Sequence, residues 1–130
     1  MPQATNLVVK NGTNVDKTFT LISPAAGDGG IASWALKEGS IASVFPLFTA
    51  SAGKTSNRSR QLRLKCRLPS SYTDTVTGLT NVGSAAEVNI TVSVPDDFPE
   101  SLKDDFVAFA TNLPSTTLVK SMIRDAYSAT

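Results

Sequence analysis

The sequence predicts an α+β protein in which a β-hairpin and an antiparallel sheet are followed by two C-terminal α-helices. Apolar and polar residues alternate through much of the first two thirds of the chain, as in strands with one buried face. After residue 95 the apolar spacing changes to three and four residues, as on one face of a helix. The 130 residues suit one domain. We therefore expect a single domain over 1–130, with the hairpin and sheet in 1–94 and a helical dimerisation segment in 95–130.

Turn-forming residues separate the predicted N-terminal strands. Asn11-Gly12 is a hairpin signal between a β-prone segment at 5–10 and an alternating segment at 16–23. Pro46 marks an edge, a bulge or a strand start. The segments expected next are a glycine-rich loop at 24–30, a strand at 31–37, a turn at 38–40, a strand at 41–52 and a polar connection at 53–56.

The clearest strand runs from residue 60 to residue 68, where the alternation is strict. Its apolar side carries Leu62, Leu64, Cys66 and Leu68, and its polar side carries Gln61, Arg63, Lys65 and Arg67. Residues 69–84 are rich in serine, threonine, glycine and asparagine, which predicts a long loop. Alternation returns at 87–94, which predicts the last strand.

The C-terminal region predicts two helices with apolar stripes. The first stripe consists of Phe98, Leu102, Phe106, Phe109 and Leu113. Acidic Asp96, Asp97 and Glu100, with Pro99 in the first turn, suit a helix start. Pro114 is expected to end this helix and Ser115 to cap the second. Two short helices give little cover for such a sheet, so we expect a second copy of the chain to supply its own helices.

The net charge of +1 hides an uneven distribution. Residues 39–73 contain no acidic residue, and six basic residues lie between positions 54 and 67: Lys54, Arg58, Arg60, Arg63, Lys65 and Arg67. Residues 95–130 contain six acidic and three basic residues. Such asymmetry indicates a charged partner where the net charge does not.

Catalytic chemistry is hard to assemble from this sequence. The absence of histidine excludes Ser-His-Asp and Cys-His nucleophile systems and histidine-ligated zinc. Cys66 is the single cysteine and falls on the apolar side of its strand, which favours a small buried hydrophobe. Gly27-Asp28-Gly29-Gly30 lacks the Lys-Ser/Thr of a phosphate loop. We expect no enzyme, metal, cofactor, membrane or small-molecule substrate, and we also expect no targeting segment, because residues 1–6 have neither a basic nor an apolar region of that kind.

The basic strand at 60–68 has two interpretations. The simpler one is a solvated strand face. The alternative is a flat surface for phosphates, because like charges at alternate positions repel and a solvated face usually mixes signs. Binding through such a surface weakens steeply with salt.

Taken in order, these segments resemble the coat proteins of single-stranded RNA bacteriophages, the leviviruses. The best local match is Asn57-Arg58-Ser59-Arg60-Gln61-Leu62-Arg63-Leu64-Lys65, which resembles the family's turn and RNA-facing strand. Gly30-Ile31-Ala32-Ser33-Trp34 resembles its third strand, and the two C-terminal helices also fit. The resemblance covers the whole chain.

The resemblance implies an intertwined homodimer with a continuous sheet, whose dimers form an icosahedral shell around single-stranded genomic RNA. The shell would assemble in the cytoplasm of the bacterial host and would form the capsid of the virion. The loop at 69–84 would line the symmetry-axis openings. The implied RNA-facing residues are Thr49, Ser51, Asn57, Ser59, Gln61, Arg63, Lys65, Glu87, Asn89 and Thr91.

The resemblance also implies that a dimer binds an RNA hairpin and represses translation. Two departures argue against this part. Ala85 stands where the family often has a tyrosine that stacks on a loop base, and Leu47 stands where a small polar residue is common. RNA packaging needs only positive charge, so these two departures do not argue against it. The alternative hypothesis is a small dimeric RNA-binding regulatory protein that forms no shell.

Overall fold

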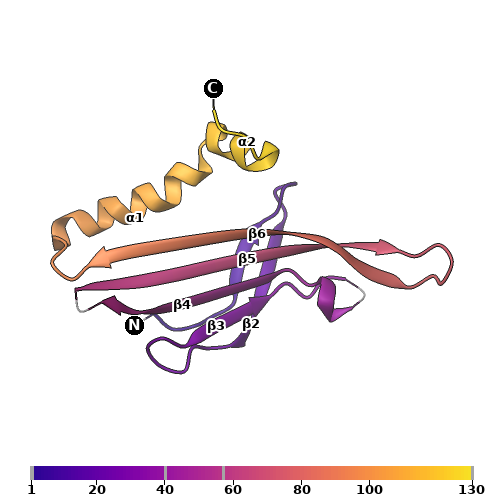
Figure 1. Cartoon of the computed structure of the whole chain (residues 1–130), viewed down its shortest axis with the longest axis horizontal. Coiled ribbons are helices and arrows are strands. Elements are labelled where there is room, and N and C mark those ends of the chain that lie inside the picture. The colour runs from indigo at the N-terminus through magenta and orange to yellow at the C-terminus, as the bar shows by residue number, and fades with distance from the viewer. Residues whose placement is uncertain (1, 40, 57, 130) are drawn as a thin grey trace. The chain divides into compact units, whose positions relative to one another are not determined.

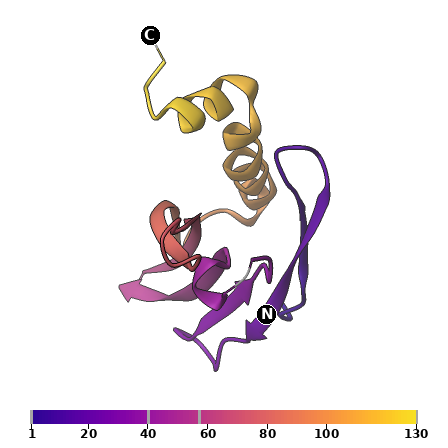
Figure 2. The same ribbon diagram turned by 90° about the vertical axis from the view of Figure 1, so that its right-hand side faces the viewer.

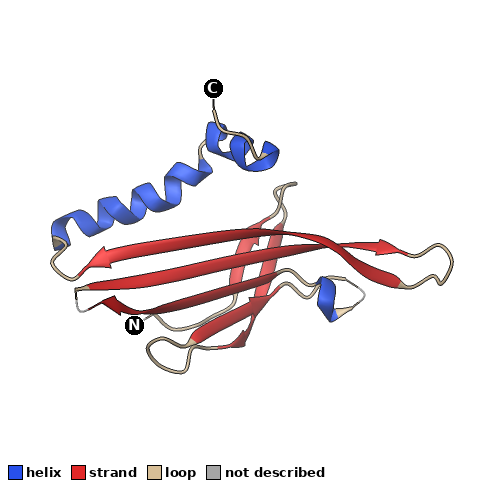
Figure 3. Cartoon of the chain, viewed as in Figure 1, coloured by secondary structure: helices blue, strands red, loops and turns tan. Residues whose placement is uncertain are grey.

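The computed structural model describes residues 2–39, 41–56 and 58–129. The chain divides into two compact units, Met1–Pro95 and Asp96–Thr130. The first unit contains the strands and the second contains the two α-helices (Figure 3).

In the described part of the first unit, six strands form one antiparallel sheet (Figure 1). The strands are β1 (Leu7–Lys10), β2 (Asp16–Ser23), β3 (Ile31–Ala35), β4 (Leu47–Ser56), β5 (Ser59–Thr73) and β6 (Thr80–Pro95). Their spatial order is their order in the sequence, so each strand pairs with its neighbours along the chain. The predicted antiparallel sheet is therefore confirmed.

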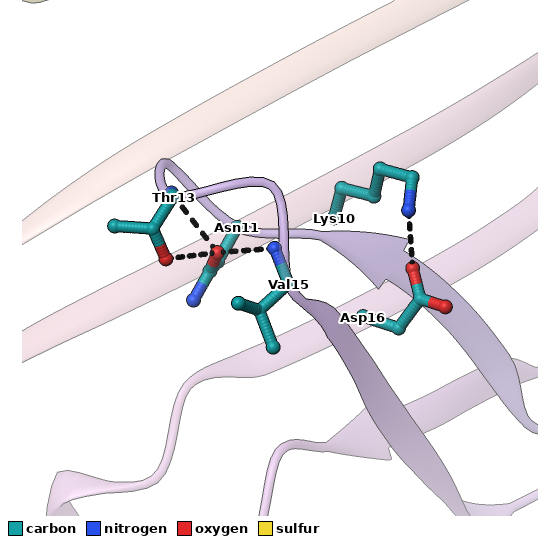
Figure 4. Close-up of polar contacts among 5 residues, drawn as sticks. All are labelled: Lys10, Asn11, Thr13, Val15 and Asp16. Atoms are coloured by element: carbon teal, nitrogen blue, oxygen red, sulfur yellow. Dashed lines mark hydrogen bonds and ion pairs between the residues drawn. The ribbon is translucent and has the colours of Figure 1, made fainter.

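The predicted hairpin at Asn11-Gly12 joins β1 and β2 (Figure 4). The Asn11 side-chain oxygen accepts hydrogen bonds from the Thr13 backbone N–H, the Thr13 hydroxyl and the Val15 backbone N–H at 2.9–3.0 Å. Lys10 and Asp16 form an ion pair of 2.8 Å at the base of the turn. Within this turn Asn14 has a left-handed backbone conformation, with a φ of 65°, which asparagine tolerates better than most residues. In Figure 2 this hairpin rises out of the plane of β3–β5, so the sheet is strongly curved.

Trp34 lies at the centre of the small core of this unit. Its indole N–H donates a hydrogen bond of 2.7 Å to the Thr5 carbonyl oxygen, and its ring packs on Phe48 with centroids 5.4 Å apart. The side chain is only 8% exposed. The other buried residues of the described chain are Ala32, Ala35, Val44 and Pro69.

The strand predicted at 41–52 is wrong in its first half. A short 3₁₀ turn, Ala42–Val44, comes first, and β4 begins after Pro46. Proline has no backbone N–H for the sheet ladder, so the strand starts beyond it. Before this turn Gly39 has a φ of 128°, and a Cβ there would lie 2.5 Å from Val44 Cγ2. Glycine is therefore required at position 39.

The polar connection predicted at 53–56 is also wrong, because β4 continues to Ser56. Its backbone is paired with β5, and Lys54 lies opposite Arg60. Small and polar residues remain in a strand when a neighbouring strand supplies the hydrogen bonds.

The long loop predicted at 69–84 is instead the end of the β5–β6 hairpin. Both strands extend through it, and only residues 74–79 form the turn. The Asp74 side chain accepts a hydrogen bond of 2.8 Å from the Val76 backbone N–H, and Gly78 takes a φ of 70°. This ribbon pairs with no third strand among the described residues, so most of its side chains stay exposed and can be polar. Polar composition reflects that exposure.

The second unit contains α1 (Lys103–Asn112) and α2 (Thr117–Asp125), with 3₁₀ turns Glu100–Leu102 and Leu113–Ser115 before and after α1. The first helix starts later than predicted, so Asp96 and Asp97 precede it and Asp104 and Asp105 occupy its first turn. Phe98 packs edge-on against Phe106, with centroids 6.0 Å apart.

Ser115 does not cap the second helix. Thr116 is the N-cap residue of α2 and makes no side-chain capping bond. The hydroxyls of Ser115 and Thr116 donate instead to the carbonyl oxygens of Asn112 and Leu113, at 2.8 and 2.9 Å. They complete the end of the preceding helix, which Pro114 cannot continue.

We predict that Trp34→Phe lowers the free energy of unfolding by about 0.5–1.5 kcal/mol, because the Thr5 carbonyl loses its donor. Trp34→Ala should cost roughly 3–5 kcal/mol, because it also leaves a cavity. Urea unfolding followed by circular dichroism measures both. Val76→Ala is the control, since Val76 is 90% exposed and its loss should change little. Equal stability of Trp34→Phe and the unmodified protein would show that the indole hydrogen bond contributes nothing.

Candidate nucleic-acid interface

The strand register places the polar residues of β4, β5 and β6 in rows across the sheet. Lys65 lies between Thr49 and Asn89, and Arg63 lies between Ser51 and Thr91. Residues directly opposite each other in an antiparallel pair point to the same side of the sheet. The two rows therefore belong to one surface.

We call this surface the polar face. It carries Thr49, Ser51, Ser59, Gln61, Arg63, Lys65, Arg67, Glu87, Asn89 and Thr91. Nine of the ten residues implied by the resemblance share it, and the tenth, Asn57, lies outside the described residues. The opposite, apolar face carries Phe48, Leu62, Leu64, Cys66, Val88 and Ile90.

Arg67 belongs to the polar face but is absent from the implied RNA-facing set. The strict alternation at 60–68 already placed it there, and the register sets it directly opposite Glu87. Leu47 completes this row on β4. Ala85 lies further along β6, opposite the buried Pro69.

The six basic residues between positions 54 and 67 do not all share one surface. Arg63, Lys65 and Arg67 lie on the polar face. Lys54 and Arg60 are cross-strand partners on the opposite side of the sheet, where the Arg60 guanidinium pairs with the Asp28 carboxylate. This ion pair links β5 to the loop that precedes β3. The segment's high charge therefore overstates the charge of the polar face.

The three polar-face cations have different neighbours. Arg63 donates a hydrogen bond of 2.9 Å from Nε to Oε1 of Gln61, a neutral partner. Lys65 Nζ and Arg67 Nε lie 3.6 and 3.7 Å from the same oxygen, Oε1 of Glu87. Two cations thus share one carboxylate at the Arg67 end of the polar face, whereas Arg63 contacts only a neutral amide at the other end.

A shallow hollow of about 220 Å³ opens on the polar face. The candidate residues that line it are Thr49, Ser51, Arg63, Lys65, Asn89 and Thr91. A neighbouring hollow of about 200 Å³ shares Ser51 and Arg63 and adds Gln61 and Gly53. Cations, hydroxyls and amides around an open depression can bind phosphate, ribose and base edges.

The described residues give little support for a metal site, a reactive cysteine or a membrane-spanning helix. No three histidine, cysteine, aspartate or glutamate side chains gather as a metal site needs, within residues 2–39, 41–56 and 58–129. Cys66 is a half-buried free thiol on the apolar face, and burial raises the pKa of this thiol. A raised pKa disfavours the nucleophilic thiolate. The two described α-helices are each too short and too polar to cross a bilayer.

Comparison with protein families now adds to this geometry. The family model described as levivirus coat protein matches residues 2–129. The chain belongs to the levivirus coat protein family. A comparison with curated proteins finds no match.

Solved structures of phage coat proteins share the fold. The virus-like particle of bacteriophage NT-214 matches with a TM-score of 0.86 at 23% identity, covering 99% of this chain and 100% of that chain. The virus-like particle of Beihai levi-like virus 21 gives 0.85 at 17% identity, with 99% of both chains covered. The bacteriophage GA capsid protein gives 0.68 at 19% identity, with 95% of both covered. The resemblance stated from the sequence is thereby confirmed at the level of family and fold.

Proposed function

We propose that this levivirus coat protein dimerises, that its dimers assemble into an icosahedral shell, and that the polar face packages single-stranded RNA inside it. The observation that carries the proposal is β6, a 16-residue strand at the edge of the sheet. Its outer edge meets no described strand and leaves a row of backbone donors and acceptors unpaired. Natural proteins rarely leave so long an edge uncovered.

A second copy of the chain satisfies this edge. Two β6 strands related by a two-fold axis run antiparallel, so their pairing extends the protomer sheet into one continuous sheet. The same pairing joins the two polar faces into a single larger surface. A dimer formed in this way has no exposed central edge.

The apolar surfaces also call for a partner. Val88 and Ile90 on the apolar face are 49% and 44% exposed in the protomer. Phe109 on α1 is 64% exposed, and Leu118 and Ile123 on α2 are similarly exposed. Monomeric proteins rarely leave contiguous apolar surface of this kind in water. Intertwining, with the helices of each copy over the apolar face of the other, buries both sets.

The polar face then remains open and supplies the RNA contact. Its cations bind phosphates and release counterions, while Thr49, Asn89 and Thr91 offer groups for sugars and bases. None of the polar-face residues is aromatic, so base stacking contributes little. Packaging of genomic RNA, which needs only charge, is thus the RNA function that the polar face supports, whereas hairpin-dependent translational repression lacks a stacking side chain on this face. The protein acts in the virion, assembles in the bacterial host cytoplasm and uses no cofactor.

Assembly is tested by size-exclusion chromatography and electron microscopy of the purified full chain. We expect closed particles that contain RNA. Dimers without particles would favour the alternative, a regulatory RNA-binding dimer that forms no shell. A stable monomer of 13.7 kDa would contradict both interpretations.

We predict that replacing Arg63 and Lys65 with serine lowers the RNA content of the particles and leaves the fold intact, because both side chains are exposed on the polar face. The measurement is nucleotides per protomer, from ultraviolet absorbance and phosphate analysis. Lys10→Ser with Lys37→Ser is the matched control, which removes two positive charges outside the polar face. Unchanged RNA content in the Arg63/Lys65 variant would exclude the polar face as the packaging surface.

We predict that Phe109→Ala weakens the dimer at least tenfold. In the protomer this ring is mostly exposed, so its removal costs the isolated chain little. Burial by a partner makes the same truncation cost roughly 3–5 kcal/mol. Sedimentation equilibrium gives the dimer dissociation constant, and Asp105→Asn on the same helix serves as the control. An unaltered constant would place Phe109 outside the interface.

A further inference from the structure

Glu87 is the acidic residue among the RNA-facing candidates, and it lies against two of the cations that RNA would need. Its Oε1 atom is 3.6 Å from Lys65 Nζ and 3.7 Å from Arg67 Nε. The three side chains are 40–51% exposed, so both ion pairs are open to water and to ligands. The register fixes this cluster, since Arg67 lies opposite Glu87 and Lys65 lies diagonally beside it.

Arg63 lies two residues before Lys65, on the same side of β5, and it forms no ion pair with a carboxylate of the described residues. Its guanidinium is oriented by the neutral amide oxygen of Gln61, which takes one donor and leaves the positive charge uncompensated. Arg63 also lines both hollows of the polar face. A phosphate at the Arg63 end therefore meets a cation with no competing carboxylate beside it.

We infer that Glu87 is an intramolecular competitor for RNA phosphates, which lowers the affinity of Lys65 and Arg67 for RNA and concentrates phosphate binding at the Arg63 end of the polar face. This inference rests on the proposed packaging function. Glu87 then contributes no attractive contact to RNA, although the family resemblance includes it among the RNA-facing residues. It acts through the two cations and determines how strongly and where the polar face binds.

The energies are of a suitable size for competition. An exposed ion pair contributes at most about 1 kcal/mol, so a phosphate can displace the carboxylate. Breaking the ion pairs of Glu87 costs free energy, which makes the net binding of the phosphate weaker. Glu87 also stays near the incoming phosphate as a like charge. Such a surface binds RNA reversibly and weakly at each protomer, and a shell with many protomers still holds a long RNA by multivalency.

The test compares Glu87→Gln with the unmodified full chain, each purified free of nucleic acid. The probe is a fluorescein-labelled 20-nucleotide oligouridine, and anisotropy gives its dissociation constant at several salt concentrations from 50 to 300 mM. Glutamine keeps the size of the side chain and removes its charge. Each released cation that gains a phosphate contact should steepen the slope of log K against log salt by about 0.7 and tighten binding at 50 mM on the order of tenfold.

Glu38→Gln is the matched control. Glu38 also forms an ion pair with a lysine, 2.8 Å from Lys17 Nζ, so its loss changes the net charge equally. Lys17 points to the same side of β2 as Phe19 and Leu21, and Leu21 pairs with Trp34 on the apolar side of the sheet, away from the polar face. We expect Glu38→Gln to leave the salt slope unchanged. An equal effect of both variants would assign the gain to net charge and overturn the inference.

A double-mutant cycle with Arg67→Gln locates the effect. In the unmodified chain, Arg67→Gln should weaken oligouridine binding less than about twofold, because the Glu87 carboxylate already competes with RNA phosphates for this guanidinium. In the Glu87→Gln background, the same substitution should weaken binding at least about fivefold. Additive effects would mean that Glu87 and Arg67 do not act on each other.

The outcomes separate the inference from the function on which it rests. If the unmodified chain binds oligouridine with a clear salt dependence and Glu87→Gln binds equally or more weakly, Glu87 is no competitor and the packaging proposal stands. If the unmodified chain shows no salt-dependent binding at all, the packaging proposal itself fails.

Discussion

The pairing of β5 with β4 and β6 determines the rest of this structure. The central strand supplies a strict alternation, and its two antiparallel neighbours carry matching alternations in register. The result is one sheet with an apolar side and a polar side. A slip of one residue in either pairing would move Arg63 and Lys65 away from Thr49, Asn89 and Thr91 and disperse the polar face.

Much of this arrangement could be predicted from the sequence, because alternation reports directly on which side of a strand is buried. The segment 60–68 shows this best, and its prediction required no knowledge of its neighbours. The segment 69–84 shows the limit of the method. Serine, glycine and asparagine are typical of loops, yet here they lie in a ribbon with both sides exposed, where no burial pattern develops.

The candidate site was predictable in its membership and less so in its electrostatics. Alternation and the family resemblance together placed nine described residues on one face. The contacts of Glu87 with Lys65 and Arg67 depend on the cross-strand register, which the sequence of either strand alone does not contain. The same holds for Arg60, whose partner Asp28 lies in a loop more than thirty residues earlier in the chain. Counting charges along the chain therefore overestimated the basic surface.

The order of the strands bears on how the sheet folds. Every strand pairs with its neighbour in sequence, so no pairing has to wait for a distant segment, and the entropy lost in closing each loop is small. The β5–β6 ribbon can zip from its Asp74 turn, and the β1–β2 ribbon from Asn11. Sheet formation can thus precede the proposed encounter with a second copy. In the proposed dimer, the concentration-dependent step is left to the β6 edge and the helices, which ties the final stability of the chain to its abundance.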